Sequence, residues 1–364
     1  ANEIGGIIAE NTTLYPGVKY ILNNNLAVPK GVTLTILPGT VIDIKIYSLN
    51  FADHTLICEG TPENPIIFTS SLESRSPYDN GCIIAGINTF KYTIFENIIR
   101  SKWLIDPDYS VFEDCRFIDM NLSQIFSTGS YSVIKSNISE VSVTAGLLSY
   151  SYNYSPKEYN NNNIINYISK NKGYDNDDFS ISENSNIFGN YHVGLPFSLI
   201  YSSQTPSVCT SQNYLGSSRE DIVRDWVFDI ANPIESVGYG GYDFSYMLDR
   251  PSAEAHGIVW KVLVNGYDAQ DEFEMLPPLG VGKHKFDVYF NRPMNKAIAP
   301  SISIGVRAPY TQHAVDENGS WNADGTIYTA YITITGKTNT DGLNRIYVYG
   351  AQDNEYFEIP EENI

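Results

Sequence analysis

The fold is decided by a stretch near the start of the chain, residues 31–44, with the sequence GVTLTILPGTVIDI. Apolar residues alternate with threonine over residues 32–36, which is the period of a strand with one buried face. The Pro38-Gly39 pair that follows predicts a turn, and residues 40–44 predict a second strand. Another strand, residues 65–70 (PIIFTS), comes after the turn signal of residues 60–64 (GTPEN).

Short segments similar to one another recur further along the chain. They are 94–98 (IFENI), 111–117 (VFEDCRF), 133–138 (VIKSNI), 159–164 (YNNNNI), 181–187 (ISENSNI) and 208–214 (VCTSQNY). Aligning the last five puts Cys115, Asn137, Asn163, Asn186 and Asn213 in register, at spacings of 22, 26, 23 and 27 residues. Such a period, with short strands and no helical pattern between them, predicts one turn of a β-solenoid.

Equivalent residues of a solenoid stack one strand spacing apart, about 4.8 Å. We therefore expect the aligned asparagines to form a ladder at one bend, where their amides bond the backbone and each other. The alternative is coincidence in a chain rich in asparagine.

A resemblance supports the solenoid. Residues 4–70 resemble the opening coils of secreted bacterial right-handed parallel β-helix proteins of the pectate-lyase-like superfamily, through residues 11–14 (NTTL), 28–42 (VPKGVTLTILPGTVI) and 65–70 (PIIFTS). The family usually has Trp where Leu14 stands and Glu where Leu37 stands. Residues 213–218 (NYLGSS) resemble its closing coil, with Leu in place of Trp. The resemblance implies the architecture but not the activity, because the family includes adhesins, glycan binders and enzymes.

Residues 218–229 (SREDIVRDWVFD) are the one convincing helix. Ser217 or Ser218 suits the N-cap, acidic residues fill the first turn, and Ile222, Val223 and Trp226 belong to one apolar stripe. A solenoid needs its open end covered, so we expect a helical cap over about residues 217–231, closing a β-helix domain of residues 1–250.

The remaining residues, 251–364, predict an all-β second domain. Residues 251–256 suit a linker, and short alternating strands separated by turn residues are typical of a β-sandwich. The expected strands are 258–264, 286–290, 302–306, 328–334 and 345–349. Residues 290–294 (FNRPM) and 350–353 (GAQD) resemble motifs of Ig-like domains in bacterial surface and secreted proteins. That resemblance covers about residues 255–360 and implies a spacer or adhesion module.

Composition narrows the functional classes. The 364 residues are 42% hydrophobic and carry a net charge of −19, with 18% charged residues. Nucleic acid and anionic membranes would be repelled by most of such a surface, and no apolar run is long enough to span a bilayer. We expect a secreted or cell-surface protein, with Ala1 following a removed leader or a trimmed end. The four cysteines, Cys58, Cys82, Cys115 and Cys209, lack metal-site spacing and are predicted to be small buried hydrophobes.

Acidic and basic residues of the β-helix offer a lyase site. Polysaccharide lyases pair an Arg or Lys base with calcium held by clustered acids. The candidates are Asp106, Asp108, Glu113, Asp114 and Asp119, with Arg100, Lys102 and Arg116. Solvated surface charge explains them equally well. The five histidines are scattered, and no nucleophile motif is present.

A tyrosine-rich segment offers a binding site. In residues 150–159 (YSYNYSPKEY), alternation puts Tyr150, Tyr152 and Tyr154 on one face if the segment is extended. Exposed rings would stack on sugars, and Trp103 is a second candidate. The alternative is a tyrosine ladder packed between coils. Asp175, Asp177 and Asp178 form a weak calcium candidate beside the simpler interpretation of a plain loop.

These observations predict a non-enzymatic extracellular β-helix that binds a polysaccharide or cell-surface glycan, or attaches its owner to a surface. We expect a monomer with no nucleic-acid partner, no membrane insertion and no cofactor other than, conditionally, calcium. The rival classes are a polysaccharide lyase or hydrolase acting on acidic glycans, and a structural cell-surface stalk.

Overall fold

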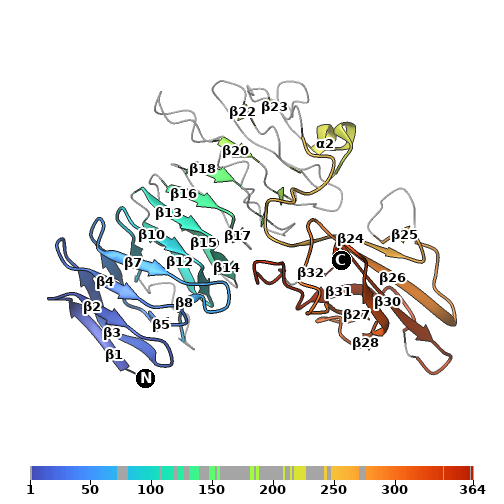
Figure 1. Ribbon diagram of the computed structural model, residues 1–364, viewed down its shortest axis with the longest axis horizontal. Helices are drawn as coiled ribbons and strands as arrows, with labels where there is room; N and C mark the ends of the chain where they lie inside the picture. The colour runs from blue at the N-terminus through green and yellow to red at the C-terminus, as the bar shows by residue number, and fades with distance from the viewer. Residues whose placement is uncertain are drawn as a thin grey trace. The chain divides into compact units, whose positions relative to one another are not determined.

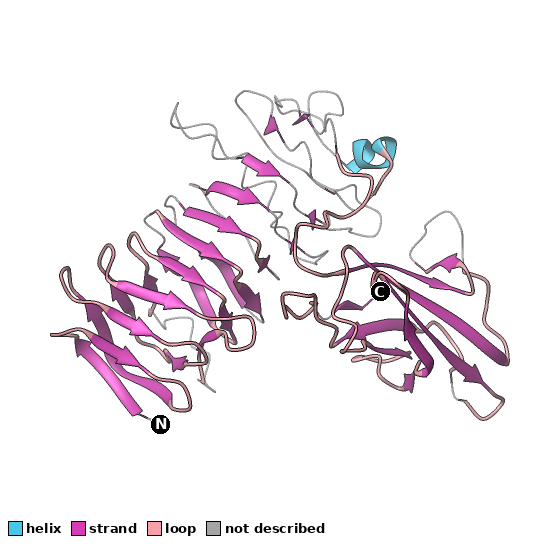
Figure 2. Cartoon of the chain, viewed as in Figure 1, coloured by secondary structure: helices cyan, strands magenta, loops and turns pink. Residues whose placement is uncertain are grey.

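The chain forms two compact units, residues 1–255 and 256–364, which divide a few residues beyond the predicted boundary at 250. Figure 1 traces the computed structural model along the chain, and Figure 2 shows that almost all of its regular structure is β-strand. The structure describes residues 2–71, 81–106, 109–118, 121–126, 131–138, 147–151, 154–155, 181–183, 186–187, 208–209, 214, 217–226, 242–243, 247–269, 276–338, 340–360 and 362–363.

The first unit is a parallel β-solenoid whose turns contribute strands to three stacks, here called walls (Figure 1). The first wall contains β2 (Thr12–Leu14), β4 (Leu34–Ile36), β7 (Leu56–Glu59), β10 (Thr89–Lys91), β13 (Ser110–Glu113), β16 (Tyr131–Ile134), β18 (Leu147–Ser151) and β20 (Ile181–Glu183). The second wall begins with the first half of β3 (Lys19–Val28) and continues through β5 (Val41–Asp43), β8 (Ile66–Thr69), β11 (Thr93–Glu96), β14 (Arg116–Ile118), β17 (Asn137–Ile138), β19 (Tyr154–Ser155) and β21 (Asn186–Ile187). The third wall contains the end of β1 (Asn2–Ile7), whose first residues pair with the first half of β3, then the second half of β3, β6 (Leu49–Phe51), β9 (Ile83–Ile84), β12 (Ile99–Asp106) and β15 (Asn121–Phe126). The predicted parallel solenoid is confirmed.

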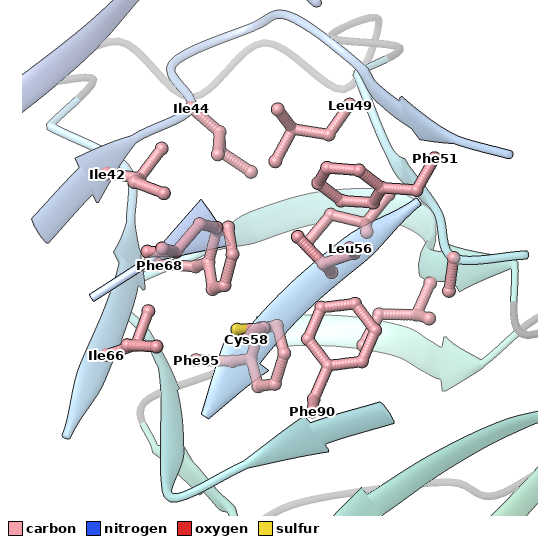
Figure 3. Packing of buried hydrophobic residues seen from close by; sticks show 14 of the residues in the cluster. Ile42, Ile44, Leu49, Phe51, Leu56, Cys58, Ile66, Phe68, Phe90 and Phe95 are labelled. Carbon is pink, nitrogen blue, oxygen red and sulfur yellow. The ribbon is translucent and has the colours of Figure 1, made fainter. Parts of the chain in front are cut away.

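Stacked phenylalanines fill the interior of the solenoid. Phe68, Phe95 and Phe117 form one column from the second wall, with neighbouring ring centroids 5.3 and 5.1 Å apart and planes within 9° and 8°. Phe90 and Phe112 form a second column from the first wall, at 5.1 Å and 8°. The columns meet edge to face, as between Phe90 and Phe68 (Figure 3). All five rings are fully buried, so strand register places equal side chains in contact.

One corner of the solenoid has the same backbone conformation and the same side-chain hydrogen bond in three successive turns. Between the first and second walls, one residue per turn adopts a left-handed backbone, with φ of 44° at Tyr92, 51° at Asp114 and 48° at Lys135. The next residue is small and buried, and its side chain donates to the carbonyl two residues earlier. These residues are Thr93, Cys115 and Ser136, with donor–acceptor distances of 3.2, 3.3 and 2.9 Å. Each of these carbonyls also accepts a backbone amide of a neighbouring turn, from Gly60, Tyr92 and Asp114 respectively, so the side chain is a second donor at the bend.

Asparagines do bridge successive turns, but not at the predicted positions. Asn11 accepts from the amide of Thr33, and Asn25 accepts from that of Ser48. Asn88 is buried, accepts from two amides of the preceding turn and donates to the carbonyls of Ala52 and Ala85.

The predicted ladder itself is wrong at two steps. Asn137 pairs with Arg116 instead of Cys115, because the inward side chains Phe112 and Val133 align and a one-residue slip would reverse the faces. Tyr154, not Asn163, stands between Asn137 and Asn186, since it pairs with both. Asn163 and Asn213 lie outside the described residues.

The predicted helix is present as α2 (Glu220–Trp226), with acidic residues in its first turn. Ser217 accepts a hydrogen bond from the Arg219 amide just before the helix begins. Val223 is fully buried and belongs to the same hydrophobic cluster as the solenoid interior, which suits a cap. The first unit also contains the strand pair β22 (Val208–Cys209) and β23 (Tyr242–Asp243).

The second unit is a sandwich of two antiparallel sheets, and every expected strand is present. The five-stranded sheet contains, in spatial order, β25 (Tyr267–Asp268), β24 (Val259–Val264), β26 (Gly282–Phe290), β30 (Ile327–Ile334) and β29 (Glu317–Trp321). The four-stranded sheet contains β28 (His313–Ala314), β27 (Ser301–Gly305), β31 (Arg345–Tyr349) and β32 (Glu362–Asn363). Both sheets contribute to one buried cluster, including Phe286, Val288, Ile304 and Val348.

Phe95 lies in the aromatic column, and its neighbour Ile94 faces the other side of β11. Phe95→Ala should lower the free energy of unfolding by about 3–5 kcal/mol, because it leaves a cavity between Phe68 and Phe117. Ile94→Ala, the matched control, should cost about 1 kcal/mol or less. Urea denaturation of the whole chain, followed by circular dichroism, measures both; equal losses would contradict the inward register.

Candidate functional site

The tyrosines expected to form a sugar platform do not share one strand. Tyr150 lies in β18 of the first wall, opposite Val133, whereas Tyr154 lies in β19 of the second wall, opposite Asn137. The expectation of a single extended segment is therefore wrong, because the chain changes walls between these two residues. Tyr152 and the side chains of Tyr150 and Tyr154 lie outside the described part of the structure, so sugar contact by these residues remains a prediction.

The other predicted ligand contacts fall largely outside the described residues. Trp103 lies in β12 of the third wall, opposite Gln124 in β15, and its side chain is not described. The calcium candidates Asp175, Asp177 and Asp178 are outside the described ranges altogether.

The solenoid separates the residues considered for a lyase site. Asp106 belongs to the third wall, Glu113 to the first and Arg116 to the second. Arg100 and Lys102 share β12 with Asp106, Asp114 occupies the left-handed position of the corner, and Asp108 and Asp119 lie outside the described residues. General acid–base chemistry needs its groups within hydrogen-bond reach of one substrate atom, and no single wall of the described structure contains Asp106, Glu113 and Arg116 together.

A buried ion pair that sequence analysis missed lies on the second wall. The Asp43 side chain is fully buried, and its Oδ2 lies 2.9 Å from Nζ of the half-exposed Lys19. Its Oδ1 accepts from the amides of Ser71 and Lys45, at 3.1 and 3.3 Å. Burial favours the neutral acid, but the hydrogen bonds from Ser71 and the Lys19 ammonium outweigh it and lower the pKa of Asp43.

The properties of this ion pair suit a role in stabilising the fold. A carboxylate with a lowered pKa is a poor proton donor and a weak base at neutral pH, whereas it accepts backbone amides well. Asp43 thus ties the segment around Ser71 to the bend after β5. One sequence signal could have indicated this ion pair. Asp43 is an acidic residue at a strand position that Ile21 and Thr69 occupy in the neighbouring turns.

Two of the three cysteines that the structure describes are buried, as predicted. Cys58 and Cys115 are free and buried, and desolvation raises the pKa of Cys58 to about 12 and that of Cys115 well above its ordinary value. Cys82 forms no disulfide and is half-buried, so it does not fit the expectation of a buried hydrophobe. Thiols held protonated in this way are poor nucleophiles and poor metal ligands. The side chain of Cys209 lies outside the described part.

A second buried network joins the two motifs of the sandwich. Asp353 Oδ2 lies 2.8 Å from His256 Nδ1 and accepts from the Gly257 amide at 3.1 Å, while Oδ1 accepts from the amides of Glu355 and Phe357. The His256 ring stacks on Phe357, with centroids 3.7 Å apart.

The FNRPM motif closes the same network. The Asn291 side chain donates to the His256 carbonyl and accepts from the Ile258 amide, and Met294 forms a β-bridge with Asp353. Arg292 pairs with Glu355 at 2.9 Å. The two sequence motifs therefore bind, through Asn291 and Asp353, the segment of residues 256–258 that leads into the first strand of the sandwich. Burial would raise the pKa of Asp353, but the hydrogen bond and charge of His256, with the backbone amides, lower it to about 2.

Comparisons with known proteins agree with the solenoid. Residues 6–91 match the family model of the pectate-lyase like beta helix domain, and these residues cover β2 to β10 with the last two residues of β1. Neither a curated protein nor a solved structure matches the chain significantly. A domain of this class in a parallel β-solenoid indicates a role related to carbohydrates. Among the described residues, no helix has the length and apolar character that a membrane crossing requires.

The lowered pKa of Asp353 makes the stability of the sandwich pH-dependent. Its folded-state pKa lies below the ordinary 3.8, so this stabilisation is complete above about pH 4 and is lost as the pH falls toward 2. Asp353→Asn should lower the free energy of unfolding by about 2 kcal/mol at pH 7, and the difference from wild type should shrink through that window. Urea denaturation at a series of pH values measures it. Asp341→Asn, at an exposed position of the same unit, is the control, and a difference for Asp353→Asn that persists at pH 2 would refute the linkage.

Proposed function

We propose that this chain is an extracellular, non-catalytic protein that binds a polysaccharide through its solenoid or attaches its owner to a glycan-bearing surface. The observation that carries the proposal is the pectate-lyase-like β-helix of residues 6–91, because this class of domain is related to carbohydrates. Stacked turns present long columns of outward side chains at the strand spacing, which suits an extended polymer.

Two features favour binding over catalysis. The acidic and basic candidates of a lyase lie on different walls, at Asp106, Glu113 and Arg116. The buried carboxylate Asp43 is held as an anion by Lys19 and backbone amides, which suits a structural role. A lyase or hydrolase of acidic glycans remains the alternative, for which Asp106 with Arg100 and Lys102 on β12 is the remaining set. A purely structural cell-surface stalk is the third class.

In this proposal the sandwich is an immunoglobulin-like spacer of the kind found in bacterial surface and secreted proteins. Its two antiparallel sheets and the network of Asn291, Asp353 and His256 support that assignment. Secretion, a monomeric state and calcium at Asp175, Asp177 and Asp178 belong to the same proposal.

A polysaccharide panel tests the function. The intact chain should co-sediment with or be retarded by at least one glycan among insoluble and soluble polysaccharides, with calcium and with chelator as separate arms. With pectate, alginate and glycosaminoglycans it should release no unsaturated product. Turnover that Arg100→Ala or Lys102→Ala abolishes, and that Lys337→Ala on the sandwich leaves unchanged, would establish the lyase alternative.

The tyrosines should be tested singly, since they belong to different walls. Tyr154 shares an outward register position with the half-exposed Arg116, so Tyr154→Ala should weaken glycan binding about fivefold with little change in Tm. Tyr150 shares the register position of the buried Val133 and Phe112, so Tyr150→Ala should lower Tm by several degrees. The reverse pattern would contradict this register.

A further inference from the structure

The outer face of the five-stranded sheet of the sandwich carries an aromatic and cationic surface. In β24, β26 and β30 the inward side chains include Val262, Phe286 and Ala330, all in the buried cluster. Because side chains alternate along a strand, the other set faces away from this core.

A β-bulge adds a large side chain to this outer face. Val259 pairs with Phe290 and Lys261 pairs with Tyr289, so Trp260 is an extra residue between two ladder pairs. Trp260 and Lys261 are consequently both half-exposed, where strict alternation would bury one of them. Bulges re-aim side chains in this way and are frequent at functional sites.

Two aromatic rings, those of Trp260 and Tyr289, meet nearly at a right angle beside the ammonium group of Lys261. We call this arrangement the Trp260 corner. The ring centroids of Trp260 and Tyr289 are 6.4 Å apart and their planes are 85° apart. The Lys261 ammonium lies 4.8 Å from the Trp260 ring and 4.5 Å from the Tyr289 ring. These contacts hold the long side chain in place, yet among the described residues Lys261 pairs with no carboxylate.

The face continues along the sheet to a second ring. Tyr331 pairs with Lys285 across the strands, and the Lys283 ammonium lies 4.7 Å from the Tyr331 ring. Lys285 and Tyr289 are four residues apart on β26, so the two aromatic positions are about 13 Å apart along the strand. Asp287 lies between them, ion-paired with Lys285 at 2.9 Å and accepting from the Thr329 hydroxyl.

The charge of this face differs from that of the chain. The whole chain carries −19, whereas the three lysines of this face, Lys261, Lys283 and Lys285, are matched by three carboxylates, those of Asp268, Asp287 and Glu317. Lys283 and Lys285 have carboxylate partners, so Lys261 is the lysine of this face that has none among the described residues. A ligand that complements the face needs an apolar surface for the rings, a hydroxyl beside the half-exposed Thr329 and a carboxylate for Lys261, because Asp287 is buried and already bonded to Lys285 and Thr329.

We infer that the outer face of the five-stranded sheet binds an acidic, uronate-containing polysaccharide, with Trp260 and Tyr289 contacting the sugar rings and Lys261 pairing with the uronate carboxylate. The inference rests on the proposed function and gives the sandwich a share in binding beyond that of a spacer. The site spans a few sugar units, from the Trp260 corner toward Tyr331.

Titration of the full chain with polygalacturonate and alginate, and with a neutral mannan for comparison, tests the inference. Trp260→Ala and Tyr289→Ala should each weaken binding of an acidic glycan about tenfold. Lys261→Gln, which keeps most of the side-chain stem, should weaken acidic binding and remove most of its salt dependence. Tyr349→Ala, a half-exposed aromatic on the other sheet, and Lys337→Ala, an exposed lysine, are the matched controls and should bind as wild type.

The outcomes separate this inference from the proposed function. Binding of acidic glycan that all three variants leave unchanged, or binding of the neutral mannan alone, overturns the inference while the proposed function stands. Wild-type protein that binds no glycan overturns both. Self-association that Trp260→Ala removes, with no glycan binding, would instead make the face an interface between copies of the chain. Thermal midpoints of the variants verify folding, and Lys261→Gln keeps the test valid if a ring deletion unfolds the sandwich.

Discussion

Parallel stacking of equivalent positions is the constraint on which the solenoid depends. Each strand pairs in register with the strand one turn away, so whatever stands at a position in one turn lies one strand spacing from its counterpart in the next. Phenylalanine meets this requirement well, because its flat ring stacks at about that separation. Phe68, Phe95 and Phe117 in one column and Phe90 with Phe112 in the other convert backbone register into continuous ring contact. A slip of one residue would turn these rings outward, which is why the register is so firmly specified.

The same constraint governs the polar groups. At the corner between the first and second walls, the carbonyl that ends each strand of the first wall accepts a backbone amide of the neighbouring turn and also a side-chain donor. Thr93, Cys115 and Ser136 supply it, each directly after a residue with a left-handed backbone. Asn88 donates to the carbonyls of Ala52 and Ala85, whereas Asp43 accepts from the backbone amides of Lys45 and Ser71. Both side chains are buried because they replace backbone partners. These buried polar residues are thus explained by the architecture without any catalytic role.

The architecture also decides where chemistry can be assembled. Glu113 and Arg116 are three residues apart in the chain, yet the corner between them sends them to different walls. Residues a full turn apart, by contrast, become neighbours. A solenoid therefore builds a functional surface from columns across turns, whereas an antiparallel sheet builds one from adjacent strands. The corner of Trp260, Lys261 and Tyr289 is of the second kind, since the pairing of β24 with β26 brings these residues together.

The sequence by itself determined the fold class, the short helix around Val223 and the strands of the sandwich. These depend on local alternation and turn residues, which a single chain displays directly. It also indicated the two sandwich motifs, although not that Asn291 and Asp353 meet around His256. Only the tertiary structure decided the register of the turns, as the displaced partner of Asn137 and the separation of Tyr150 from Tyr154 demonstrate. The physical reason is that register and bulges depend on which strand faces are buried against strands distant in the sequence. The number of residues in a turn of the solenoid varies from turn to turn, whereas the distance between stacked strands does not.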